Sequence, residues 1–190
     1  MDIEEVIAGR RSCRQYSEQA VDEHTIRRLI DAAVLAPNAV NEQPWMFTVV
    51  RDQPLLDRLS QQAKRHMLAT MPAEAPAEAR ARHFRSVLED PDFHIFYHAP
   101  VLILISGRTA GSWLIEDCAL AAENLMLMGH ALGLGSCWIG FAQGYLNTPA
   151  GKQMLELPAA SVPVAPIIIG HPRMPTPPPG RRPPEVRWIG

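Results

Sequence analysis

The sequence predicts a protein of the α+β class, folded as one domain over residues 1–190. With 47% hydrophobic and 20% charged side chains in 190 residues, the chain can bury a substantial core without disulfides. Helix-spaced apolar residues and short, nearly unbroken apolar runs both occur along it. No internal repeat and no linker-like stretch divides the sequence, so we expect these elements to share a core.

Two helices are predicted before residue 38, and both have recognisable ends. The first starts near Ile3, carries acidic residues in its first turn and ends at Gly9. Asp22 is a suitable N-cap for the second, and Pro37 stops it. The apolar residues of the second helix follow the helical repeat, at Ile26, Leu29, Ile30, Ala33 and Val34.

A polar loop, a strand and a helix follow in the next third of the chain. We expect the loop at residues 38–45, the strand at 46–51 and the helix at 54–71, which Pro54 opens at its first position. Residues 72–92 are rich in Pro, Ala, Glu and Arg without a firm period. They predict a mobile helical excursion.

The second half alternates strands with helices. Strands are expected at residues 99–106, 133–141 and 162–170, with helices at 113–132 and 147–157. The run 99–106 is almost wholly apolar, which is typical of a buried strand. The helix 113–132 is apolar nearly all round, which indicates a central position, and its main stripe is Ile115, Cys118, Ala119, Ala122, Leu125, Met126 and Gly129.

The last twenty residues, 171–190, differ from the rest. Seven prolines lie between Pro172 and Pro184, so this segment is extended and cannot form a helix. It ends in VRWIG, and an indole such as Trp188 favours burial. A stiff arm with an aromatic end suggests that it wraps over a second subunit.

Composition excludes several classes of protein. A net charge of −2 gives no basic face for nucleic acid. The acidic N-terminus lacks the apolar region of a signal peptide, and the run 99–106 is far too short to cross a bilayer. The three cysteines are far apart with no CxxC pair, which favours a reducing compartment. We therefore expect a cytoplasmic protein without membrane partners.

Two motifs suggest ligand sites that the surrounding residues do not support. GLGSCWIG has Trp138 where a dinucleotide-binding fingerprint needs Gly, and it follows a helix rather than a strand. His94 and His98 have the spacing of one helix face, but Ile95 stands where the zinc protease motif has Glu, and two ligands do not complete a zinc shell. We predict no metal, and interpret Phe93, Phe96 and Tyr97 as the wall of an apolar site.

The segment RRSCRQY, residues 10–16, is the strongest candidate for a binding site. Three guanidinium groups surround one hydroxyl, which suits bidentate recognition of a phosphate. Arg181 and Arg182 could add charge from the other end of the chain. Cys13 beside arginines could be a thiolate, but no histidine lies near in sequence as a base, so we do not favour it as a nucleophile. A solvated basic turn is the alternative.

Five segments, taken in order, resemble the nitroreductase family of FMN-dependent flavoproteins. RRSCRQY resembles the family's Arg-Arg-Ser-x-Arg-x-aromatic opening, and APNAVNEQPWMFTVV its Ala-Pro-Ser-x-x-Asn-x-Gln-Pro-Trp-x-Phe stretch. Three further blocks of the family are resembled by later segments of the chain: FYHAPVLILI, the segment 115–140, and APIIIGHPR with the later RRPPEVRW. Asn38 stands where Ser is usual, and Cys13 where an aliphatic residue or Thr is usual. The resemblance implies a mostly antiparallel sheet flanked by helices, in an intertwined homodimer with an extended C-terminal arm.

The resemblance also implies a set of FMN-binding residues. Arg10, Arg11 and Ser12 would bind the phosphate and ribityl end, joined by Arg181 at the phosphate. Arg14 would lie at the pyrimidine edge of the ring, where a guanidinium stabilises the negative charge of reduced flavin. The backbone of Ile139 and Gly140 would face the N5 edge of the flavin ring. The other subunit would contribute a further loop, with Pro37, Asn38, Ala39 and Asn41.

The implied activity is a ping-pong oxidoreduction. NADH or NADPH would reduce FMN, and a nitroaromatic, quinone or similar small acceptor would reoxidise it, so no protein nucleophile is needed. Residues of about 66–98 would cover the pocket and select the acceptor. Family members that dehalogenate, oxidise heterocycles or cleave flavin are alternatives. A flavin-holding or redox-sensing protein without turnover is another.

Overall fold

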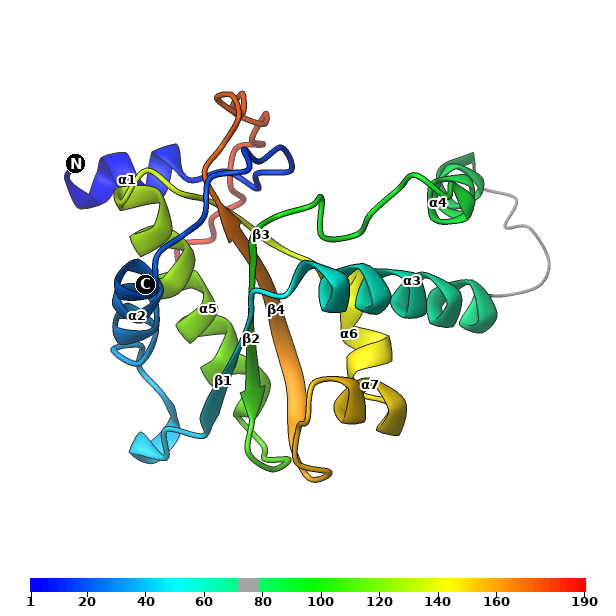
Figure 1. Ribbon diagram of the computed structural model, residues 1–190. Helices are drawn as coiled ribbons and strands as arrows, with labels where there is room; N and C mark the ends of the chain where they lie inside the picture. Colours follow the sequence, from blue (N-terminus) through cyan, green and yellow to red (C-terminus); the bar gives the residue numbers. More distant parts are fainter. Residues whose placement is uncertain (72–78) are drawn as a thin grey trace.

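A computed structural model describes residues 1–71 and 79–190 of the chain. Its centre is one sheet of four strands in the order β1-β2-β4-β3, and every neighbouring pair is antiparallel. The strands are β1 (Trp45–Val50), β2 (Val101–Gly107), β3 (Gly135–Trp138) and β4 (Val162–Gly170). Helices cover both faces of this sheet (Figure 1). The predicted α+β class and antiparallel sheet are confirmed.

The two faces of the sheet pack against different helices. Ile103 and Ile105 of β2 face α2 (Glu23–Ala33) and α5 (Leu114–Ala131). Leu102 and Leu104 face the opposite side, where α3 (Gln53–Thr70), α6 (Gly140–Leu146) and α7 (Pro149–Met154) lie. Successive side chains of a strand point to opposite faces, so a strand covered on both sides must be apolar at every position. This explains the unbroken run that predicted β2.

Local signals set the starts of the first helices. In α1 (Ile3–Gly9), Asp2 and Glu5 form a reciprocal capping box. Asp22 caps α2 by accepting a hydrogen bond from the Thr25 amide, as the sequence predicts. The helix ends at Ala33, four residues before Pro37, and the predicted polar loop contains a short 3-10 helix, η1 (Ala39–Asn41).

The long helix α5 lies in the predicted place, but one end of its predicted stripe is wrong. Ile115 is 62% exposed, whereas its neighbour Leu114 is buried. Asp117, one turn along from Leu114, is also buried. Leu120 is 45% exposed, so α5 is not surrounded by protein along its whole length. Within the described residues, no helix combines the length and the apolar content that crossing a bilayer demands.

The region after β3 differs from its prediction. The strand ends at Trp138, and residues 140–146 form α6 rather than continuing an extended chain. The predicted helix 147–157 is shorter, with α7 capped by Thr148. The prediction missed α6 because it starts at Gly140 and its N-cap, Ile139, has no side chain that can cap a helix.

The predicted excursion contains a further helix, α4 (Ala79–Glu89), which stands out from the body in Figure 1. Residues 72–78 of the excursion lie outside the described part of the chain. Between α4 and β2, His94 and His98 do not share a helix, contrary to the spacing argument. They lie in a turn in which Tyr97 and His98 have positive φ angles of 51° and 52°.

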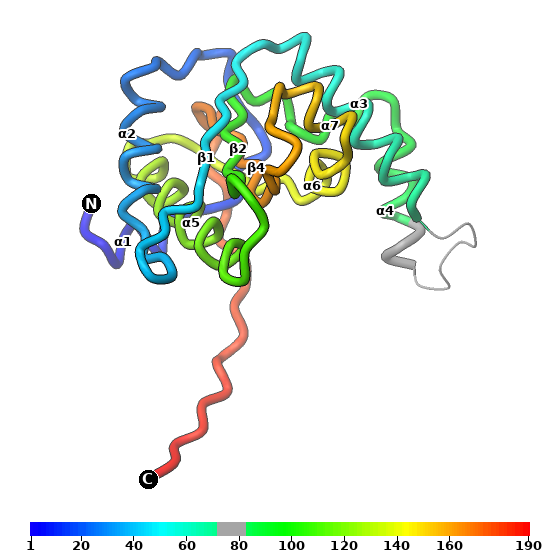
Figure 2. The backbone as a smooth tube through the Cα atoms, turned by 90° about the horizontal axis from the view of Figure 1, so that it is seen from below, coloured from blue at the N-terminus to red at the C-terminus, as the bar shows by residue number. Residues whose placement is uncertain are grey.

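The C-terminal arm is extended, as its prolines predict. Residues 173–190 contain no helix or strand, and Figure 2 shows the end of the arm projecting away from the body. Trp188 and Ile189 at its end are 91% and 98% exposed. The burial of Trp188 by a second subunit therefore stays a prediction.

A close backbone approach at Gly135 yields a test of this packing. A Cβ added at Gly135 would lie 2.6 Å from Cys13 Cβ and 2.8 Å from Cys13 Sγ. We expect Gly135→Ala to lower the free energy of unfolding by about 1–3 kcal/mol, because overpacking forces these segments apart. Urea denaturation measures this. Gly111→Ala is the control, since a Cβ there meets nothing within 4 Å; equal stability of the two variants would contradict the packing described.

Candidate functional site

The segment that carries the arginines is held against the end of the sheet. Ser12 forms a parallel bridge with Ser136 of β3, and the Cys13 amide donates to the Ser136 carbonyl at 2.9 Å. Further along, the Tyr16 hydroxyl donates to the Cys13 carbonyl at 2.7 Å. Cys13 and Tyr16 are buried while Ser12 and Arg14 are exposed. The extended backbone therefore turns the polar side chains outward.

Arginines from both ends of the chain line one cavity of about 360 Å³. The N-terminal segment contributes Arg10, Arg11, Ser12 and Arg14, and the C-terminal arm contributes Arg181 with Thr176, Pro177 and Pro179. No carboxylate belongs to this lining among the described residues. Four guanidinium groups around one hollow form a site for an anion with several acceptor oxygens. The predicted convergence of Arg10 and Arg181 is thus present within one chain.

Two of the arginines that line the cavity have a buried Nε without a hydrogen-bond partner in the described structure. Arg11 Nη1 donates to the carbonyls of Ala8 and Arg10 at 2.6 and 2.8 Å, but Arg11 Nε is buried with no hydrogen-bond partner in the described structure. Arg10 Nε lies 3.3 Å from Glu123 of α5, an ion pair that lacks hydrogen-bond geometry. Because an unsatisfied buried donor is costly, such groups mark where a ligand can supply acceptors.

A second cavity, of about 300 Å³, adjoins the first at Arg14, which lines both. Its other lining residues are Met67, Tyr97, Cys137, Trp138, Ile139, Gly140 and Phe141. A Cβ at Gly140 would meet no atom within 4 Å, so a ligand can approach this backbone closely. The predicted pair Ile139 and Gly140 therefore lies in a hollow that also contains Arg14, beside the cavity lined by four arginines.

Aromatic side chains cluster beside the second cavity, which Tyr97 and Phe141 line. The ring of Phe93 lies 5.7 Å from that of Tyr97 and 6.1 Å from that of Phe141, in edge-to-face contacts. Phe84 of α4 lies 5.2 Å from Phe141. Of the three predicted wall residues, Tyr97 lines the cavity, Phe93 contacts Tyr97 and Phe141 without lining it, and Phe96 is fully buried in the core. Sequence reasoning missed Phe84 and Phe141, because nothing local predicts that α4 and α6 meet.

Two groups beside Arg14 have shifted pKa values. Burial raises the pKa of the Tyr97 hydroxyl, and the nearby Arg14 guanidinium, 6.0 Å from the ring centre, opposes this shift. Burial also raises the pKa of the Cys137 thiol, again opposed by Arg14. Both side chains are therefore neutral near pH 7, so neither forms an ion pair with Arg14.

The predicted loop at residues 37–41 lies elsewhere. In Figure 1 it is at the lower end of the sheet, whereas the N-terminal segment after α1 is at the upper end. The Ala39 amide donates to buried Asp117 at 2.9 Å, and Asn38 Oδ1 accepts from the Gln43 amide at 2.8 Å. Pro37 and Asn41 are exposed. One chain therefore does not bring this loop to the arginine cavity.

Comparisons with known proteins agree on one family. The family model described as "Nitroreductase family" matches residues 7–171. A Methanothermobacter thermautotrophicus protein, provisionally named NADH dehydrogenase/NAD(P)H nitroreductase, is 30% identical over 90% of this chain and 78% of its own length. The 5,6-dimethylbenzimidazole synthase of Rhodospirillum rubrum is 27% identical over 90% and 82%.

A solved structure shows the same fold. The nitroreductase of Bacteroides fragilis, crystallised with bound FMN, superposes with a TM-score of 0.85 over all of both chains, at 23% identity. The matched residues 7–171 include the N-terminal arginines, the whole sheet and both of its helical layers. This chain belongs to the nitroreductase family.

Proposed function

We propose that the protein binds FMN in the two adjoining cavities and uses it to pass electrons from NADH or NADPH to a small acceptor. The observation that carries the proposal is a cavity lined by four arginines from both chain ends, beside a more apolar cavity that shares Arg14 with it. FMN has the matching form, with a phosphate at one end and a planar ring at the other. The related Bacteroides fragilis protein holds this cofactor.

The chain's own residues divide the work along this hollow. Arg10, Arg11 and Arg181 are assigned to the phosphate, and Ser12 to the phosphate and ribityl end. The buried, unpaired Nε of Arg11 supports this assignment, because a phosphate supplies the acceptor that the protein lacks. Arg14, at the junction of the cavities, is assigned to the pyrimidine edge of the ring.

The chemistry belongs to the cofactor, and the protein sets its surroundings. Bound FMN supplies two-electron oxidation and reduction. The charge of Arg14 stabilises negative charge that develops beside it, more strongly in a partly buried site than in water. The aromatic wall of Phe93, Tyr97 and Phe141 excludes water and favours flat acceptors such as quinones and nitroaromatics. The backbone at Ile139 and Gly140 leaves the cavity floor open.

We further propose that two copies of the chain complete each site. The loop 37–41 is far from the arginines of its own chain, and Val40 beside the predicted residues is 88% exposed. Leu35, Trp113 and Ile115 are also exposed, at 80%, 63% and 62%. Large exposed apolar side chains of this kind are typical of an interface. In a homodimer, Pro37, Asn38, Ala39 and Asn41 would contact the flavin of the partner.

The proposal predicts a visible flavin spectrum in the purified protein. We expect the absorbance to bleach with NADH or NADPH under anaerobic conditions and to return with menadione or a nitroaromatic. Stopped-flow absorbance measures both half-reactions. Bound flavin that neither nicotinamide reduces would favour a non-catalytic flavin protein, and a colourless protein that does not take up FMN would overturn the proposal.

The division of roles predicts different effects for two arginines. At saturating FMN, Arg14→Ala should lower kcat by about 10²–10³-fold, because it removes charge stabilisation beside the ring. Arg11→Ala should mainly weaken FMN binding. Steady-state NAD(P)H oxidation and fluorescence titration of FMN separate the two effects. Equal losses of kcat in both variants would contradict the assignment.

The proposed dimer predicts that the end of the arm anchors the assembly. Trp188→Ala should weaken dimerisation about 30-fold, the effect typical of an aromatic hot spot. Sedimentation equilibrium measures the dissociation constant. Glu185→Ala, in the same arm, is the matched control and should leave the constant unchanged. A monomeric wild-type protein, or equal constants for the two variants, would argue against this role.

A further inference from the structure

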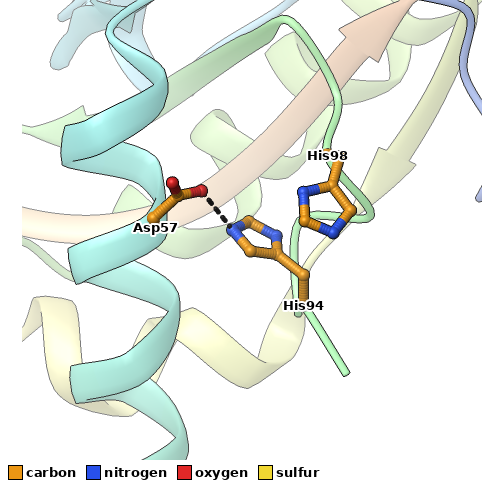
Figure 3. A group of neighbouring side chains, drawn as sticks. All are labelled: Asp57, His94 and His98. Atoms are coloured by element: carbon orange, nitrogen blue, oxygen red, sulfur yellow. Dashed lines mark ion pairs between the residues drawn. The ribbon is translucent and has the colours of Figure 1, made fainter. Parts of the chain in front are cut away.

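Three side chains with metal-binding atoms meet outside the two cavities described above. Asp57 comes from α3, and His94 and His98 come from the turn between α4 and β2. Their ligand atoms all lie within 4.8 Å of one another. Figure 3 shows the carboxylate of Asp57 directed toward the imidazole of His94, with the ring of His98 alongside. The structure thus adds a third ligand that the sequence argument, with its two histidines, did not contain.

The spacing of these atoms suits a small divalent cation. His94 Nε2 lies 3.2 Å from Asp57 Oδ1. That separation is close to the roughly 3.3 Å between neighbouring ligands of a tetrahedral ion with bonds of about 2.0–2.1 Å. The imidazole of His98 lies 4.4 Å from that of His94, with the planes inclined by 30°. His98 is exposed, so a change of its side-chain rotamer can complete the site.

His94 provides independent evidence that the site is made for a ligand. Its side chain is only 10% exposed, and its Nε2 is buried without a hydrogen bond of acceptable geometry. A buried imidazole nitrogen that faces a carboxylate without a well-formed hydrogen bond is satisfied when a cation lies between them.

The backbone around the cluster is already fixed. The Ile95 amide donates to Ser60 Oγ of α3 at 3.1 Å. Lys64 Nζ, one turn further along α3, donates to the Phe93 carbonyl at 2.8 Å. These contacts hold the turn against α3, so little ordering remains to be done on binding. One contact opposes the site, because His94 Nδ1 accepts a hydrogen bond from the Phe96 amide at 3.2 Å. If Nε2 bound a metal, the ring proton would move to Nδ1 and face the Phe96 N–H.

We propose that Asp57, His94 and His98 bind one zinc-type divalent cation, with water completing its shell. Two imidazoles and a carboxylate are ligands that Zn²⁺ accepts, and Asp57 is 52% exposed, so a water position remains open. The opposing Phe96 contact should lower the affinity about 10–100-fold relative to a site in which Nδ1 has an acceptor, so we expect binding in the micromolar range. The site is separate from the proposed flavin cavities and does not rest on the proposed function.

The consequence is a connection between the cation and the aromatic wall. The turn that carries His94 and His98 also carries Tyr97, which lines the second cavity, and Phe93, whose ring packs against Tyr97. A cation shared with Asp57 ties this turn to α3. The cation would therefore stabilise the position of Phe93 and Tyr97 without contacting a ligand in the second cavity.

Isothermal titration of the full-length, tag-free, chelator-washed protein with ZnCl₂ tests the proposal. We expect one cation per chain with a micromolar dissociation constant, and a higher melting temperature in its presence. His98→Gln and Asp57→Asn should each weaken binding at least tenfold and abolish the thermal shift. Both changes are at exposed positions, and circular dichroism checks that the variants fold.

His24→Gln is the matched control, because His24 is exposed at the start of α2 and far from the cluster in sequence. It should bind Zn²⁺ as the wild type does. Absence of binding at millimolar ZnCl₂ would overturn the proposal. So would unchanged binding in both His98→Gln and Asp57→Asn, which would place the ion at other residues such as the three free cysteines.

Discussion

The attachment of residues 12–17 to the end of the sheet is the constraint on which the rest of the site depends. Hydrogen bonds from Cys13 to Ser136 and from Ser17 to His171 fix this segment at both ends. Cys13 packs into the space that Gly135 leaves free. Because the backbone is fixed and Cys13 and Tyr16 are buried, the neighbouring Ser12 and Arg14 are directed outward, toward the cavity that they line.

This constraint also explains why the two ends of the chain meet. The residues that follow β4 run beside the N-terminal segment, where Tyr16 pairs with Pro172. The arm that begins there is stiff, so it places Arg181 at a set distance from the bridge. A cationic hollow is thereby assembled from positions about 170 residues apart in sequence, without a glycine-rich phosphate loop. The second cavity, which shares Arg14, is lined by Cys137 and Trp138 at the C-terminal end of β3.

The sequence predicts elements with strong local signals and fails where tertiary contacts decide. The unbroken apolar runs gave β2 and β4, and Asp22 and Pro54 marked helix starts. Helix α6 has no such signal, and the stripe of α5 could not show that Ile115 faces outward. The arginine cluster was recognisable, and Arg181 could be suggested as a further charge, but its specific place at the phosphate rested on family resemblance. Asp57 could not be foreseen, because only packing brings α3 to His94.

The exposed end of the arm has a consequence for how the protein behaves on dilution. Arg181 and Trp188 belong to one proline-stiffened segment, and Trp188 has no contact that buries it within its own chain. If the tryptophan docks on a second copy, the same event restrains the arginine at the mouth of the cationic hollow. Prosthetic-group retention and self-association then become linked equilibria, so that separating the subunits also releases the flavin.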